Sequence, residues 1–144
     1  MRRLRDDSGS IMPLTIFYGV LSLLLVLLVV AATSLYLERK RLFTLADGAA
    51  LVGAEAYDLA DIATEGGGRR VVLDTADVAS AVDDYIAGYP TGRFESLAVE
   101  RAASGDGRSA TVTLSSYWRP PLLSLLVPSG IRIEVTAVAR SVLD

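Results

Sequence analysis

The residues best suited to chemistry in this chain are carboxylates in two small groups. Asp58, Asp61 and Glu65 stand at positions i, i+3 and i+7, so a helix would place them on one face, and Asp83 and Asp84 are adjacent. Grouped carboxylates can bind a hard cation or act as a general acid and base. The same spacing is typical of a solvated helix face, which is the interpretation we favour because acidic side chains are mostly exposed.

The residue types that are missing exclude several kinds of site. The chain of 144 residues contains no Cys and no His, which excludes thiol nucleophiles, disulfides, the common zinc sites and His-based triads. Gly105-Asp106-Gly107 lacks the further ligands of a calcium loop and is predicted to be a turn. The sequence has no glycine-rich phosphate cradle. We therefore expect no enzyme activity, no cofactor, no metal ion and no small-molecule substrate.

Four aromatic residues could form a surface for a carbohydrate or a partner protein: Tyr85, Tyr89, Tyr117 and Trp118. Packing in the core and at its rim is the alternative. We favour packing, because aromatic side chains bury large apolar areas in small domains.

The elements that would position these residues begin with a membrane segment. Thirty consecutive residues, 8–37, carry no charge, and about 20 apolar residues suffice to cross a bilayer. We predict a short cytoplasmic N-terminus at 1–10 and a transmembrane helix at 11–37. A buried core helix is a poor alternative, because a domain of about 100 residues cannot surround such a segment. A cleaved secretory signal is also a poor alternative, because such a signal usually has only about 7–15 apolar residues and this segment is about twice as long.

Charge is divided along the chain. Residues 1–41 hold six Arg and Lys and three Asp and Glu, whereas the remainder is acidic. An acidic domain argues against nucleic acid as a partner. Basic residues flank the span on both sides, so they orient it weakly. The short N-terminus and the acidic domain favour an inside N-terminus and an outside C-terminal domain, in the cytoplasmic or inner membrane.

The helix is predicted to continue beyond the membrane as an amphipathic extension at 38–65. Apolar and small residues recur there at spacings of three and four, which is typical of a helix seam. A dense patch of small residues forms a predicted helix-packing interface: Ala46, Gly48, Ala49, Ala50, Gly53 and Ala54. Small residues let another backbone approach closely. The neighbour is either the chain's own domain or a helix of another subunit.

A small extracytoplasmic domain is predicted at 69–144. Asp74 suits an N-cap for a helix at Thr75–Ala87. Three strands are expected, at Phe94–Arg101, Ser109–Trp118 and Ile131–Arg140, and their one-sided alternation predicts an antiparallel sheet with one covered face. The fold class is therefore α+β, with the long N-terminal helix and the second helix packed on a small sheet.

An apolar loop between Pro120 and Pro128 interrupts the strands. It could close one end of the core, dock a partner or touch the membrane surface. Its apolar residues are candidates for partner docking: Leu122, Leu123, Leu125, Leu126 and Val127.

Two stretches resemble the TadE/TadG-like proteins of tight-adherence (Flp-type) pilus systems. One is Ser8-Gly9-Ser10-Ile11-Met12-Pro13 before the span, and the other is the leucine-alanine-aspartate pattern followed by small residues at 41–54. The last predicted strand, at Ile131–Arg140, also resembles the way such proteins commonly end. The resemblance implies a pilin-like fold and a minor pilin or pseudopilin. Its partners would be the lipid bilayer, other pilins or pseudopilins and secretion-platform proteins.

The chain departs from the wider pilin pattern at its N-terminus. Prepilin processing uses a glycine with a glutamate five residues beyond the cut, and Leu14 occupies that position relative to Gly9. The departure favours an accessory, tip or platform role over a fibre-forming one. The alternative function is a single-pass, membrane-tethered regulatory or ligand-binding module. It is weakened because only residues 1–7 would lie in the cytoplasm to carry a signal.

Overall fold

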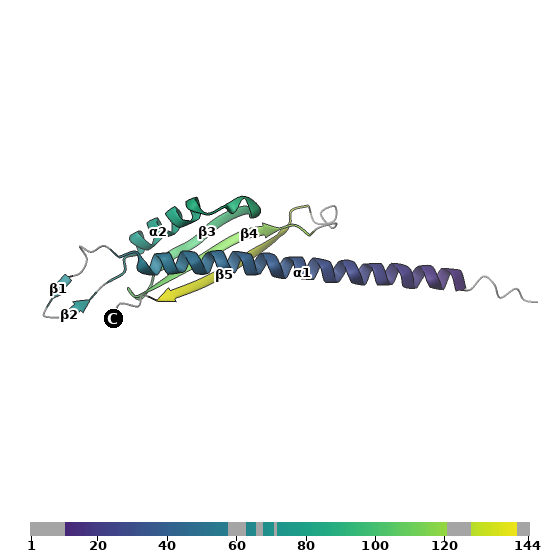
Figure 1. Ribbon diagram of the computed structural model, residues 1–144, viewed down its shortest axis with the longest axis horizontal. Coiled ribbons are helices and arrows are strands. Elements are labelled where there is room, and N and C mark those ends of the chain that lie inside the picture. The colour runs from purple at the N-terminus through teal and green to yellow at the C-terminus, as the bar shows by residue number, and fades with distance from the viewer. Residues whose placement is uncertain (1–10, 58–62, 66–67, 71, 121–127, 141–144) are drawn as a thin grey trace, which may run out of the picture.

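A long helix and a small sheet dominate the architecture in the computed structural model, which describes residues 11–57, 63–65, 68–70, 72–120 and 128–140. The helices are α1 (Ile11–Glu55), α2 (Thr75–Gly88) and a short 3-10 helix, η3 (Thr91–Arg93). The strands are β1 (Ala63–Glu65), β2 (Gly68–Arg70), β3 (Glu95–Ser104), β4 (Ser109–Trp118) and β5 (Ile131–Arg140). The C-terminal half of α1 lies along the sheet, and its N-terminal half projects beyond the domain (Figure 1).

The end of α1 corrects the predicted extension at 38–65. The helix has 45 residues and ends at Glu55, and Ala63–Glu65 instead form β1, which pairs antiparallel with β2. After Glu55 the α-helical hydrogen bonding gives way to a bond from Ala56 N to Gly53 O. Gly53 already packs on Ala110, the second residue of β4. A longer helix would therefore run past the end of the sheet and leave its apolar side uncovered.

The sheet of three long strands has the order β3-β4-β5 and is antiparallel throughout. The β4–β5 ladder runs without a shift from Ser109↔Arg140 to Trp118↔Ile131, whereas the β3–β4 ladder contains two register shifts. The bounds of β4 and β5 agree with the sequence prediction. Strand β3 begins one residue later and ends three residues later than predicted, because its weak alternation is broken by these bulges.

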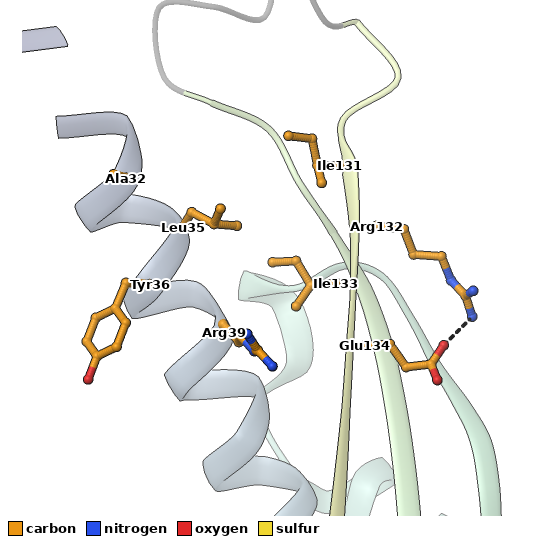
Figure 2. Close-up of a pocket in the computed structure, with 8 residues that line it drawn as sticks. All are labelled: Ala32, Leu35, Tyr36, Arg39, Ile131, Arg132, Ile133 and Glu134. Atoms are coloured by element: carbon orange, nitrogen blue, oxygen red, sulfur yellow. Dashed lines mark ion pairs between the residues drawn. The ribbon is translucent and has the colours of Figure 1, made fainter. Parts of the chain in front are cut away.

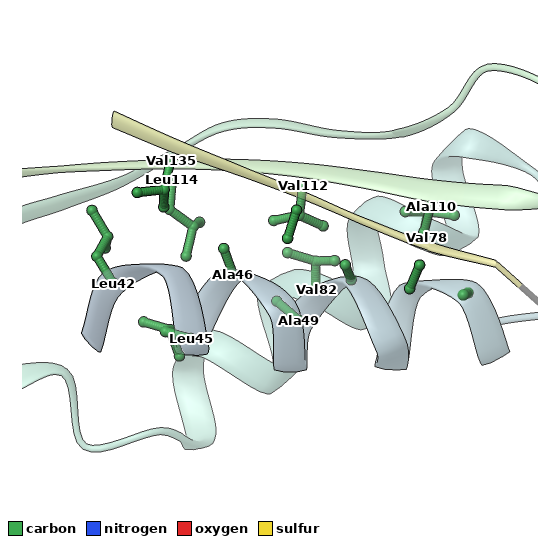
Figure 3. Close-up of a cluster of buried hydrophobic side chains, with 14 of the residues drawn as sticks. Leu42, Leu45, Ala46, Ala49, Val78, Val82, Ala110, Val112, Leu114 and Val135 are labelled. Atoms are coloured by element: carbon green, nitrogen blue, oxygen red, sulfur yellow. The ribbon is translucent and has the colours of Figure 1, made fainter. Parts of the chain in front are cut away.

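The core lies between α1, α2 and one face of the sheet (Figure 3). Helix α1 supplies mostly small residues, and the facing strands supply larger ones such as Val112, Leu114 and Val135. Helix α2 adds Val78 and Val82, which are fully buried. The small side chains of α1 let the helix lie close to both the sheet and α2. The predicted α+β class is thus confirmed.

The start of α2 also agrees with the sequence prediction. Asp74 is the N-cap, and the Ala76 backbone N–H donates to its Oδ1 at 2.8 Å. This bond satisfies one of the backbone donors that a helix leaves free in its first turn.

Candidate functional site

The N-terminal half of α1 is the first candidate surface. Its large apolar side chains between Ile11 and Val30 are exposed, apart from the half-buried Leu27, because the domain does not cover this part of the helix. In the described part of the chain, α1 is the one helix long and apolar enough to cross a membrane. Twenty residues of helix extend about 30 Å, which matches the hydrocarbon thickness of a bilayer. This half of α1 indicates an association with the membrane.

The domain meets α1 inside the uncharged segment. Ala31 is buried, and the indole Nε1–H of Trp118 donates to Ser34 Oγ at 3.2 Å. The predicted span at 11–37 therefore overlaps by seven residues with the part of α1 that carries the domain. Little or no bare helix separates the apolar segment from the folded domain.

The small-residue face of α1 packs on the chain's own domain, which was the first of its two predicted alternatives. A Cβ atom at Gly53 would lie 3.1 Å from Val78 Cγ1 and 3.2 Å from Ala110 Cβ, and a Cβ atom at Gly48 would overlap the Tyr85 hydroxyl. The remaining members of the face are also buried: Ala46, Ala49, Ala50 and Ala54. Their side chains leave almost no surface for a helix of another subunit.

Beside the small-residue face, another side of α1 is open. We call it the outer stripe, and it consists of exposed residues spaced four, three, four and four apart: Tyr36, Lys40, Phe43, Asp47 and Leu51. Such spacing places them on one helix face. Phe43 is 47% exposed and Leu51 is 52% exposed. Large apolar side chains beside charges of both signs are suited to contact with another protein.

A groove runs between α1 and β5 near the end of the apolar segment (Figure 2). Its volume is about 490 Å³. Leu35, Ile131 and Ile133 give it an apolar lining, and Arg39 extends from α1 on the side that faces β5. Tyr36, the first residue of the outer stripe, also borders the groove. Arg132 and Glu134 point away from α1, on the other side of the strand (Figure 2). We call this feature the α1–β5 groove.

The sheet face away from α1 carries a polar network. Glu100 Oε1 accepts from Ser115 Oγ at 2.6 Å and from Arg132 Nη2 at 2.8 Å, and Arg132 also pairs with Glu134 at 3.2 Å. The hydrogen bonds from Ser115 and Arg132 lower the pKa of Glu100 below its usual value. Thr113 bonds Thr136 across the strands at 3.0 Å. One arginine therefore pairs with two glutamates on this face, and Thr113 and Ser115 of the central strand are buried beneath these longer side chains.

The structure describes three of the five predicted acidic residues. Asp83 and Asp84 are exposed on α2, whereas Asp58 and Asp61 lie outside the described residues and Glu65 lies in β1. Among the residues searched, no group of three potential metal ligands occurs. The loop with Leu122, Leu123, Leu125, Leu126 and Val127 also lies outside the described residues.

The four aromatic residues are divided between two regions. Tyr85 of α2 and Tyr89, the residue that caps the C-terminal end of α2, have ring centroids 6.1 Å apart. Tyr117 and Trp118 are neighbours on β4, so their side chains point to opposite faces of the sheet. Trp118 is buried against α1, whereas Tyr117 is exposed. They do not form a common surface.

The comparison with known families bears on the long helix. Residues 9–56 match the family model described as "Putative Flp pilus-assembly TadE/G-like". This segment, one third of the chain, is similar to that family. The predicted resemblance is confirmed there, and it indicates a role related to Flp pilus assembly. No curated protein and no solved structure matches the chain.

Sequence reasoning missed both the outer stripe and the α1–β5 groove. The stripe has a signal in the sequence, since Tyr36 and Phe43 are seven residues apart and Leu51 follows eight later. The charged residues Lys40 and Asp47 lie between them on the same helix face, so the apolar residues do not form a continuous pattern. The groove has no comparable signal, because it joins Leu35 to residues about 100 positions later in the chain and depends on how β5 lies against α1.

Proposed function

We propose that this protein is a non-catalytic assembly component, a minor pilin or pseudopilin, of a tight-adherence (Flp-type) pilus or a related secretion apparatus. One observation carries the proposal. The segment that is TadE/G-like, residues 9–56, coincides almost residue for residue with α1, Ile11–Glu55. The likeness to pilus-assembly proteins thus lies on the helix, and the sheet serves to hold and present that helix.

In this proposal α1 crosses the cytoplasmic or inner membrane once. The N-terminus lies inside and the α+β domain lies outside, as the basic residues before the span and the acidic domain favour. The apolar half of α1 is stored in lipid and is available to helices of other pilins or pseudopilins. Association in the membrane then depends on van der Waals packing along these helices.

Above the membrane, the outer stripe is the helix surface offered to other subunits. The small-residue face is already occupied by α2 and the sheet. Tyr36, Phe43 and Leu51 form an apolar line on the open side of α1, and Lys40 and Asp47 can pair with opposite charges of a neighbouring helix. This surface continues the line of the membrane segment, so one partner helix could follow α1 from the bilayer into water.

Co-purification from the native cell tests the function. We expect the tagged full chain, extracted in mild detergent, to recover pilins, pseudopilins or secretion-platform proteins. An untagged strain and an unrelated single-pass membrane protein with the same tag are the controls. Recovery of a soluble regulator without any pilus or secretion component would contradict the proposal and support a membrane-tethered regulatory or ligand-binding module.

A further inference from the structure

We propose that the α1–β5 groove binds one phospholipid of the leaflet that the domain faces, with the phosphate at Arg39 and the glycerol and first acyl carbons on Leu35, Ile131 and Ile133. The proposal concerns a lipid site on the domain itself, so it goes beyond the role in pilus assembly.

The depth of the groove in relation to the bilayer is the first argument. The exposed apolar half of α1 ends near Val30, and the groove begins at Ala32 and reaches Arg39. These eight residues are separated by seven helical rises, which extend about 10 Å along the helix. The headgroup region on each side of a bilayer is about 5–8 Å thick, and a long arginine side chain can reach back toward it. The groove therefore opens at the level where phospholipid headgroups lie.

The lining of the groove is the second argument. Ile131, Leu35 and Ile133 supply apolar surface along the groove, and Arg39 supplies a cation at the end farther from the apolar half of α1 (Figure 2). Ile131 is 45% exposed, which is unusual for an isoleucine that starts a core strand. A phospholipid has the same sequence of chemistry, from apolar chains to a negative phosphate. The groove and the lipid are thus complementary in both polarity and charge.

The charges around the groove leave Arg39 available for a phosphate. Among the residues that the structure describes, neither Asp nor Glu forms an ion pair with Arg39. The nearby Glu38 pairs with Arg41 at 3.6 Å, and Glu134 pairs with Arg132 on the opposite side of β5. Arginine binds phosphate oxygens through charge-assisted hydrogen bonds.

Trp118 can report on the depth of the domain because it is the single tryptophan of the chain. It pairs with Ile131 across the β4–β5 ladder and bonds Ser34 of α1. In phospholipid vesicles containing the full chain, we expect its fluorescence to be quenched more by lipids brominated near the glycerol than by lipids brominated near the chain ends. If neither set quenches Trp118, the domain stands clear of the bilayer and the proposal is wrong.

Lipid retention tests the groove directly. We expect native mass spectrometry of the full chain, released from phosphatidylglycerol nanodiscs, to show one tightly retained lipid. The variant Arg39→Gln should lower this retention about tenfold, the effect of one lost charge-assisted hydrogen bond, and Arg39→Lys should keep part of it. Lys40→Gln is the matched control, because Lys40 is the next residue and does not line the groove.

The outcomes separate a bound lipid from general attraction to a charged surface. Loss with Arg39→Gln and retention with Lys40→Gln supports the proposal. Equal loss in both variants, unchanged retention in Arg39→Gln, or no retained lipid in the parent chain each contradicts it. An unchanged emission maximum of Trp118 shows that the variants keep the fold. None of these results bears on co-purification with pilus components, so the two proposals can fail separately.

Discussion

Gly53 joins α1 to its own domain at a point where three side chains of α2 and β4 surround it closely. A Cβ atom at Gly53 would lie only 3.1–3.3 Å from side-chain atoms of Val78, Val82 and Ala110, and all three residues are buried. We expect Gly53→Leu to lower the free energy of unfolding by about 1–3 kcal/mol or more, the typical cost of overpacking a core. Urea unfolding of the detergent-solubilised chain, followed by Trp118 fluorescence, measures this change.

Gly88 provides the matched control for that substitution. It ends α2, and a Cβ atom there would meet nothing within 4 Å. Gly88→Leu should therefore change the unfolding free energy much less than Gly53→Leu. Equal effects of the two substitutions would show that Gly53 is not packed as described.

Asp106 holds the turn between β3 and β4 together. Its carboxylate accepts the backbone N–H groups of Arg108 at 2.9 Å and Ser109 at 2.6 Å, and also the Ser109 hydroxyl. These hydrogen bonds lower the pKa of Asp106 to about 2, from an ordinary value of 3.8. Because the folded-state pKa is the lower one, the contribution to stability is fully present above about pH 4 and is lost as the pH falls toward 2.

Asp106→Asn should consequently weaken the dependence of stability on pH between about pH 4 and pH 2. Urea midpoints measured across this range, in the parent chain and in the variant, give the comparison. Asp83→Asn is the control, because Asp83 is exposed on α2 and should leave the pH dependence almost unchanged. A variant whose pH dependence equals that of the parent would contradict the role assigned to Asp106.

At the scale of elements, the N-cap decides where α2 begins. Asp74→Ala removes the acceptor for the Ala76 N–H and should destabilise the domain by about 1 kcal/mol, the usual effect of losing such a cap. Asp84→Ala, within the same helix and exposed, is the control and should cost much less. Thermal or urea unfolding measures both. Similar losses in the two variants would show that the cap contributes little.

Those elements that carry local signals could be predicted from the sequence. The cap at Asp74 and the alternation in Ser109–Trp118 and Ile131–Arg140 depend on neighbouring residues, so their bounds agree closely with the structure. The end of α1 could not be predicted in this way. Its heptad spacing continues past Glu55, whereas the sheet that covers the helix stops near Gly53 and Ala110.

The candidate surfaces show the same division between local and distant information. Composition identified the membrane half of α1 and the small-residue face, because both are continuous in the sequence. Composition could not show what covers the small-residue face, because the cover comes from α2 and β4, which are distant in the sequence and pack on α1 only in the folded chain. The polar network at Glu100 had no signal either, because it joins side chains of three strands.

For the molecule as a whole, the continuity of α1 couples the domain to the membrane. One unbroken helix carries the apolar segment at 11–30 and the packed segment at 31–55. The domain packs on the helix from Ala31 onward. No exposed linker therefore separates the domain from the apolar segment and allows the two to reorient. A force that draws the apolar segment out of the bilayer would therefore move the domain with it. Such coupling suits a component that is stored in lipid and then incorporated into a larger assembly.

The last prediction concerns the surface by which that assembly forms. If the outer stripe packs against other subunits, the double substitution Phe43→Gln and Leu51→Gln should reduce recovery of pilus or secretion components several-fold, because it removes the large apolar contacts from the open side of α1. The unfolding free energy should change little, since both side chains are about half exposed. Val138→Gln is the matched control, because Val138 is equally apolar, is 61% exposed and lies on β5 away from the stripe. Undiminished recovery with the double variant would show that assembly uses the membrane half of α1 or another face of the domain.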